Sequence, residues 1–176
     1  CGYLALMSGI ATGAERVYLN EDGLTLAQLA KDSARMVESF RSGRQLYLVI
    51  RNERASENYT LDVLAKIFAQ EGRGLYDVRH AAIGHLQQGG DPSSFDRIMA
   101  TKLVAHALGL LADQLEAGTH HSSYVGLTEG RITHHRLERM NDELDLSARR
   151  PLHQWWMGLR EAIALVSQNA GVIPLE

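Results

Sequence analysis

The chain is predicted to adopt an α/β fold with a largely parallel sheet, and two observations predict it. Short runs of β-branched and aliphatic residues alternate with longer segments in which apolar residues recur at helical spacing. At 176 residues, with 45% hydrophobic and 22% charged residues, the chain can build one substantial core and is not disordered by composition. We therefore expect a globular α/β structure without internal repeats.

The first half of the chain should alternate helices and strands. Thr25 and Gln28 are placed for a capping box at the start of one helix, and Gly43 is placed to end it. The run Gln45–Ile50 is typical of a strand buried on both faces. The elements expected here are, in order, an opening helix that ends near Gly13, a strand at Arg16–Leu19, the helix that ends at Gly43, the strand Gln45–Ile50, and a helix at Thr60–Gln70.

The second half should begin with a strand and a long helix. A turn at Thr128-Glu129-Gly130 should join two paired strands. Trp155 and Trp156 belong to the apolar face of an expected last helix. The elements expected here are a strand at Ala81–His85, a mostly buried helix at Phe95–Leu115 ended by Gly118, paired strands at Tyr124–Leu127 and Arg131–His134, and the last helix at Pro151–Ser167.

The segment between the strand at Ala81–His85 and the long helix has the features of an anion site. It reads Gly-His-Leu-Gln-Gln-Gly-Gly-Asp-Pro-Ser-Ser-Phe-Asp-Arg from Gly84 to Arg97. Paired glycines let the backbone approach a ligand, and the following helix start adds its positive dipole end. A plain strand-to-helix turn, with Asp91 as N-cap and Pro92 at the first helical position, explains the same local pattern.

Charged residues fall at the ends of the expected elements. Glu53 follows one strand, Arg79 precedes another, His85 ends it, and Arg149 precedes the last helix. Strands that are parallel neighbours would place Glu53 and His85 at one edge of the sheet, where ligands of open α/β sheets usually bind. A carboxylate can accept hydrogen bonds from sugar hydroxyls, whereas arginine and histidine can hold phosphates. Taken singly, each residue also fits a solvated loop charge.

Composition and spacing argue against several other functions. The net charge of −3, without a dense basic stripe, argues against a nucleic acid partner. The apolar run at the start is too short for a membrane span, so we expect no membrane partner. The single cysteine, Cys1, excludes an intrachain disulfide and fits a reducing compartment such as the cytoplasm. His120-His121 and His134-His135 lack zinc-ligand spacing, so we expect no metal site.

Five segments, in order, resemble the ATP-dependent phosphofructokinases. Gly84–Arg97 closely resembles their fructose-phosphate-binding segment, and Cys1–Ala5 resembles the residues after their Met-Gly turn. The other three are Arg51-Asn52-Glu53, which resembles the sugar-binding glutamate segment, Asp77-Val78-Arg79, which resembles the phosphate-binding arginine segment, and Arg149 with Pro151 and Gln154-Trp155-Trp156, which resembles a C-terminal arginine segment of the long eukaryotic-type enzymes. The resemblance implies a Rossmann-like three-layer phosphofructokinase fold, of which this chain is the C-terminal portion of one half.

The resemblance also indicates which half of these two-half enzymes the chain belongs to. Catalytic halves generally carry an arginine where this chain has Gln88, and losing it removes a charge-assisted contact of roughly 1.5–3 kcal/mol. The resemblance thus implies the regulatory half, in which the former substrate site binds fructose 2,6-bisphosphate. Arg79 would reach a site in a neighbouring subunit. The implied effector-binding residues are Glu53, Arg79, His85, Leu86, Gln87, Gln88 and Arg149, with no catalytic residue and no metal ligand among them.

The resemblance carries further expectations about organisation. Residues 1–86 would be part of the sugar-phosphate-binding subdomain, residues 87–140 a return segment packing on the nucleotide-type subdomain, and residues 141–176 a returning C-terminal helix. The glycine-rich ATP loop and the Asp-containing catalytic turn lie further upstream in this family, so we expect a truncated chain that is inactive alone. Mg²⁺ would act with ATP in the full-length enzyme, a cytoplasmic tetramer or larger. Two alternatives remain: a catalytic half that binds fructose 6-phosphate as substrate, and a non-catalytic module for subunit assembly.

Overall fold

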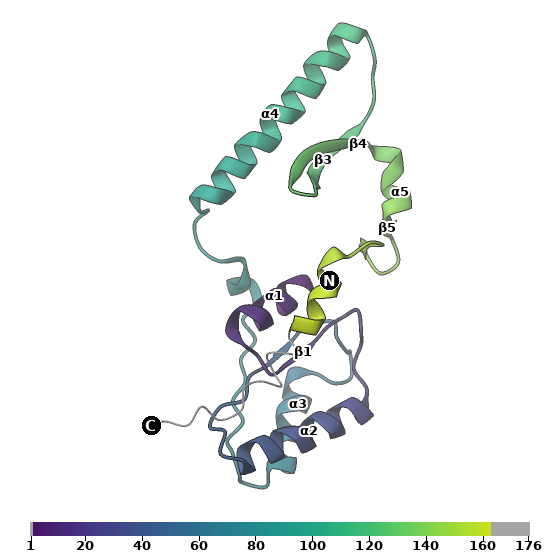
Figure 1. The fold of residues 1–176 in the computed structure, drawn as a ribbon. Helices are drawn as coiled ribbons and strands as arrows, with labels where there is room; N and C mark the ends of the chain where they lie inside the picture. Colours follow the sequence, from purple (N-terminus) through teal and green to yellow (C-terminus); the bar gives the residue numbers. More distant parts are fainter. Residues whose placement is uncertain (1, 163–176) are drawn as a thin grey trace. The chain divides into compact units, whose positions relative to one another are not determined.

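The structure is a computed structural model that describes residues 2–162. The described residues divide into two compact units, 2–82 with 154–162, and Ile83–His153 (Figure 1). The first unit contains α1 (Tyr3–Thr12), β1 (Arg16–Tyr18), α2 (Leu26–Arg41), β2 (Val49–Arg51), α3 (Leu61–Gly72) and the 3₁₀ helix η3 (Trp155–Leu159). The second contains η1 (Gly84–Gln88), α4 (Ser94–Ala117), β3 (Ser123–Thr128), β4 (Arg131–Arg136), η2 (Leu137–Arg139), α5 (Met140–Glu143), β5 (Leu144–Asp145) and β6 (Arg150–Pro151). The expected division at residues 86 and 140 stays a prediction.

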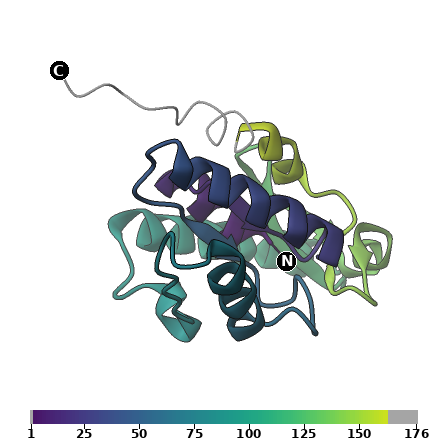
Figure 2. The same ribbon diagram turned by 90° about the horizontal axis from the view of Figure 1, so that it is seen from below.

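The first unit is a three-layer arrangement around a parallel pair of strands. β1 and β2 pair in register, with Val17 opposite Ile50, which confirms parallel pairing. Leu6 of α1 packs in one buried cluster with Leu19 and Trp156, against which Val17 and Ile50 also pack. On the other face α2 and α3 lie side by side (Figure 2). Their buried cluster contains Tyr18, Leu29, Met36, Ala55, Leu64 and Phe68.

The helix α2 begins where its sequence signals predict. The Thr25 side chain accepts a hydrogen bond from the backbone N–H of Gln28, and the Gln28 side chain accepts one from the N–H of Thr25. This reciprocal contact is a capping box, and it satisfies two backbone donors that the helix leaves unpaired. β2 is shorter than the strand expected at Gln45–Ile50. Its partner β1 has only three residues to pair with, and Leu46 is left 75% exposed.

A buried polar network joins β1 to α2. Asp32 of α2 is 4% exposed, and its carboxylate accepts a hydrogen bond of 3.0 Å from the Tyr18 hydroxyl. The Arg16 Nε lies 2.8 Å from the same carboxylate oxygen. A buried carboxylate is costly unless it is paired, so this arrangement fixes α2 against one strand.

The second unit is built from a long helix and an antiparallel hairpin. β3 and β4 pair over six residues each, and Glu129 and Gly130 at their turn have φ values of 52° and 77°. Two successive positive φ values suit a tight hairpin turn, and the two paired strands expected here are confirmed. α4 contacts this hairpin, and the Nε2 atom of His106 lies 3.0 Å from Nδ1 of His134.

The helix α4 differs from its prediction at its start and in its burial. Its N-cap is Ser93, not Asp91, because Ser93 and Asp96 form a capping box that fixes the first turn beyond Pro92. The helix was expected to be mostly buried, yet none of its residues is buried in the structure. Its apolar residues surround the whole helix, so the hairpin can cover only one side. Phe95 remains 70% exposed and Leu115 66%.

The length and mean hydropathy of α4, 1.2 over its most apolar stretch, would also suit a membrane-crossing helix. Core helices of water-soluble proteins meet the same two criteria, so these properties alone do not identify a membrane span. The expectation that the chain has no membrane partner stays a prediction.

Two other expected elements are wrong. Ala81–His85 is not a strand: within the described chain it pairs with no other strand, and Gly84 turns it, with φ at 51°, into the 3₁₀ helix η1. The last helix does not begin at Pro151, because that residue pairs with Leu144 in the short β5–β6 ladder. The end of that expected helix, residues 163–167, lies outside the described residues.

Candidate functional site

The loop after β2 carries Glu53 and is held by Arg51. The Arg51 guanidinium donates hydrogen bonds to the backbone carbonyls of Tyr59 and Glu53, both at 3.0 Å, and to the carbonyl of Ser56. Partial burial lowers the pKa of Arg51, and the nearby Glu53 carboxylate opposes that effect. The guanidinium is thus surrounded by carbonyl oxygens of its own loop.

Glu53 itself is exposed at the start of this loop. Its neighbours are ordered by local bonds, since the backbone N–H of Arg54 donates to the Asn52 side chain at 3.0 Å and the N–H of Asn52 donates to the Tyr18 carbonyl at 2.8 Å. The second bond extends the ladder between β1 and β2 by one residue. Glu53 therefore presents its carboxylate to solvent from an anchored backbone at the end of β2, where ligands of α/β sheets bind.

Arg79 lies in the irregular segment that follows α3. Its side chain is exposed, but both neighbours are fixed: Val78 packs against the core cluster, and the His80 Nε2 atom lies 2.9 Å from the Asp62 carboxylate of α3. Within residues 2–162, no ion pair occupies the Arg79 guanidinium. This geometry leaves the arginine open to a phosphate ligand.

The four predicted residues His85, Leu86, Gln87 and Gln88 form most of the 3₁₀ helix η1 in the second unit. All four are exposed, and Leu86 is 82% exposed. The helix ends at Gly89, whose φ of 80° favours glycine, and a Cβ atom there would meet nothing within 4 Å. The segment thus forms an open, polar turn rather than the end of a strand.

Arg149 lies in the turn between β5 and β6, with a φ of 52° in the left-handed region. Asp145 orders this turn, because its Oδ1 atom accepts hydrogen bonds from the N–H groups of Ser147 and Ala148 and from the Ser147 hydroxyl. These bonds, the one from Ala148 foremost, lower the pKa of Asp145. A non-glycine residue adopts this conformation only where its surroundings impose it, so the exposed Arg149 side chain leaves a constrained turn.

The structure sorts the seven predicted residues into two sets. Glu53 and Arg79 belong to the first unit, whereas His85–Gln88 and Arg149 belong to the second. All seven are exposed, and among the described residues no hydrogen bond or ion pair links one side chain of the seven to another. Nor does any group of three or more His, Cys, Asp or Glu residues in residues 2–162 have the spacing to hold a metal ion.

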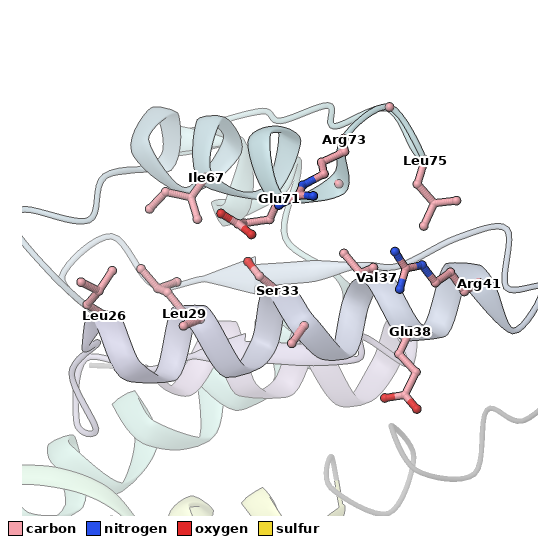
Figure 3. Close-up of a pocket in the computed structure, with 14 residues that line it drawn as sticks. Leu26, Leu29, Ser33, Val37, Glu38, Arg41, Ile67, Glu71, Arg73 and Leu75 are labelled. Carbon is pink, nitrogen blue, oxygen red and sulfur yellow. The ribbon is translucent and has the colours of Figure 1, made fainter.

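A groove between α2 and α3 is a separate feature of the first unit (Figure 3). It has a volume of about 1020 Å³ and contains none of the seven predicted residues. Apolar side chains such as Val37 and Ile67 line it together with the charged side chains of Glu38, Arg41 and Glu71. The groove does not contribute to the predicted sugar-phosphate site.

Sequence reasoning missed the role of Arg51. It grouped this residue with Glu53 as one sugar-binding segment, but the structure shows its donors turned onto backbone carbonyls. An arginine at the end of a strand looks the same in sequence whether it binds a ligand or a loop. The polar run of eight residues from Arg51 to Asn58 was the one signal that a loop needed such support.

Comparisons with known proteins assign the chain to a family. The family model described as phosphofructokinase matches residues 1–111. An ATP-dependent 6-phosphofructokinase of Dictyostelium discoideum is 41% identical over 178 aligned residues, which cover 100% of this chain and 21% of that protein. The human muscle-type ATP-dependent 6-phosphofructokinase is 33% identical, covering 96% of this chain and 23% of that protein. The chain thus spans less than a quarter of the length of these relatives.

Solved structures agree with the sequence comparisons. The phosphofructokinase from Saccharomyces cerevisiae superposes with a TM-score of 0.86 at 28% identity, over 94% of this chain and 23% of that chain. The Pichia pastoris phosphofructokinase in the T-state gives a TM-score of 0.81 at 25% identity, over 97% and 21%. The predicted α/β fold class is confirmed by these superpositions. The chain belongs to the phosphofructokinase family.

Proposed function

We propose that this chain is part of a 6-phosphofructokinase, which transfers a phosphoryl group from ATP to fructose 6-phosphate, and that it contributes an allosteric site for fructose 2,6-bisphosphate. Such an enzyme would be cytoplasmic and an oligomer, a tetramer or larger. The observation that carries the allosteric assignment is Gln88, which stands where catalytic halves of the resembling enzymes generally have an arginine. Mg²⁺ would act with ATP in the full-length enzyme, and no role of the described residues depends on it.

The chemistry of the exposed residues suits a sugar that carries two phosphates. Arg79, His85 and Arg149 supply cationic or hydrogen-bonding groups for phosphate oxygens, and arginine does so with a fork of donors. Gln88 can offer an amide to the ligand, but not the charge that a substrate phosphate would find on arginine. Glu53 can accept hydrogen bonds from sugar hydroxyls, and its anchored backbone limits the entropy lost on binding.

One of the solved structures supports an allosteric enzyme in general terms. The Pichia pastoris phosphofructokinase was solved in the T-state, a term for one of the alternative conformations of an allosteric protein. An effector regulates such a protein only when it binds one conformation more tightly than the other. By analogy with the family, Arg79 would contact ligand bound in a neighbouring subunit, so this site would sense how subunits are arranged.

The test is a titration of the full-length enzyme with fructose 2,6-bisphosphate, following activity at limiting fructose 6-phosphate. Arg79→Ala and His85→Ala should each raise the half-activating concentration by roughly 10- to 150-fold, the loss of one charge-assisted hydrogen bond. Matched controls are Arg35→Ala and His120→Ala, which remove an exposed arginine and an exposed histidine that are not among the predicted site residues. Unchanged activation in both site variants would refute the assignment.

The same variants separate the two alternatives. If the segment binds substrate, Arg79→Ala and His85→Ala will raise the KM for fructose 6-phosphate even without the bisphosphate. If it is only an assembly module, the bisphosphate will not stabilise the full-length protein against heat, and the variants will change its oligomeric state instead. An allosteric site predicts ligand-dependent stabilisation that both variants lose.

A further inference from the structure

We infer that Arg51 is a positioning residue, which holds the β2–α3 loop so that Glu53 faces a sugar hydroxyl, and that it does not bind phosphate itself. The inference rests on the proposed function, because it concerns how Glu53 is presented. It separates two residues that are neighbours in one short segment. Glu53 would contact the ligand, and Arg51 would act only by holding the backbone of the loop.

The hydrogen bonds of Arg51 span the whole loop. Its Nη1 donates to the carbonyl of Glu53 at 3.0 Å, its Nη2 to the carbonyl of Ser56, and its Nε to the carbonyl of Tyr59 at 3.0 Å. The three acceptors lie near the start, middle and end of the connection between β2 and α3. A planar guanidinium that donates in three fixed directions therefore sets the path of the loop, including the peptide of Glu53 itself.

Other contacts anchor the loop but leave Glu53 free. Ala55 is 3% exposed and packs in the core cluster, and Tyr59 packs against that cluster. The N–H of Tyr59 donates to the Ser56 hydroxyl at 3.0 Å. Between the end of β2 and the buried Ala55, Glu53 projects into solvent from a backbone whose carbonyl is already held by Arg51.

The same geometry argues against Arg51 as a phosphate ligand. Each of its three nitrogen atoms donates to a carbonyl oxygen, and its side chain is partly buried. These bonds use three of its five N–H groups, and drawing the guanidinium toward a phosphate would strain the bonds that hold the loop of Glu53. Arg79, which is exposed and has no ion pair within the described chain, has no such conflict.

Lysine cannot replace Arg51 in this role. An ammonium group keeps the charge but concentrates its donors at one point, so it cannot reach three carbonyls that the guanidinium reaches from three nitrogen atoms. Arg51→Lys should therefore loosen the loop while leaving the local charge unchanged. Arg54→Lys is the matched control, because Arg54 is exposed in the same loop and its side chain makes no hydrogen bond there.

The experiment compares Arg51→Lys, Glu53→Gln, the double variant and Arg54→Lys in the full-length enzyme, titrated with fructose 2,6-bisphosphate. We expect Arg51→Lys and Glu53→Gln each to raise the half-activating concentration about tenfold. The double variant should be no worse than Glu53→Gln alone, because both changes remove the same contact. Arg54→Lys should match the wild type. Additive effects of the two changes, or a wild-type response of Arg51→Lys, would overturn the inference.

Amide hydrogen exchange tests the positioning role without any ligand. Peptides that cover residues 52–59 should exchange faster in Arg51→Lys than in the wild type or in Arg54→Lys. Ser56→Ala removes the hydrogen bond between Tyr59 N–H and the Ser56 hydroxyl. It should also speed amide exchange and raise the half-activating concentration, but by less than Arg51→Lys does. If Glu53→Gln leaves activation unchanged while exchange still rises in Arg51→Lys, the proposed function fails and the positioning role stands. Unchanged exchange would refute the positioning role.

Discussion

Replacing Asp32 by alanine should destabilise the protein by about 2–4 kcal/mol. The Tyr18 hydroxyl would lose a bond to a buried carboxylate, which costs about 1.5–3 kcal/mol. The contact with Arg16 adds about 0.5–1 kcal/mol, because that side chain is 33% exposed and partly screened by water. The measurement is urea unfolding followed by tryptophan fluorescence, which Trp156 reports from a buried cluster of the same unit.

A matched variant and a double-mutant cycle make this prediction sharp. Glu38→Ala removes an exposed carboxylate from the same helix and should change stability by no more than about 0.5 kcal/mol. Tyr18→Phe alone should cost about 1.5–3 kcal/mol, because it removes that hydrogen bond and leaves the carboxylate buried. Combined with Asp32→Ala, it should add little, since both changes remove one hydrogen bond, giving a coupling of at least about 1 kcal/mol. Equal effects of Asp32→Ala and Glu38→Ala, or simple additivity with Tyr18→Phe, would refute the reasoning.

Three further predictions concern pH and helix structure. Burial, followed by the negative charge of Asp32, raises the pKa of Tyr18 above its usual value near 10. Its contribution to stability should therefore be complete below about pH 10 and be lost as the pH rises further, and tyrosinate absorbance should show it titrating later in the folded than in the unfolded protein. Ser93→Ala should cost about 1 kcal/mol and speed amide exchange in the first turn of α4, and an unchanged first turn would contradict the capping box. Gly72→Ala would place a Cβ 2.7 Å from the Tyr76 ring and should lower stability by about 1–3 kcal/mol. Gly109→Ala, with nothing within 4 Å, should raise it by about 0.5–1 kcal/mol in thermal unfolding, and equal signs for the two glycines would count against the packing described.

Sequence reasoning succeeded where the deciding contacts are local. The start of α2 follows from Thr25 and Gln28, which lie three residues apart and bond to each other whatever the rest of the chain does. It failed for Ala81–His85, because a strand needs a partner elsewhere in the chain and an apolar run does not reveal one. At α4 it considered only Asp91 as the N-cap. Ser93 has Asp96 three residues later, which is the spacing of a capping box.

The candidate site shows the same limit. The sequence identifies residue types that suit a sugar phosphate, and Glu53 and Arg79 do lie exposed on anchored backbone. It could not distinguish Arg51 from a ligand-binding arginine, because the acceptors of its hydrogen bonds depend on the path of a folded loop. The left-handed backbone of Arg149 could not be predicted either, because the hydrogen bonds of the Asp145 turn that accompany it form only in the folded chain.

The two capping boxes have a consequence for the order of folding. Each joins residues only three positions apart, so α2 and α4 can begin at fixed residues as soon as those turns form. The parallel pair β1–β2 instead joins Arg16 to Val49 across the whole of α2, and closing that loop costs entropy before any strand contact repays it. Folding of the first unit should therefore slow when Thr25 and Gln28 lose their contact, because the first turn of α2, worth about 1 kcal/mol at its cap, then forms less readily.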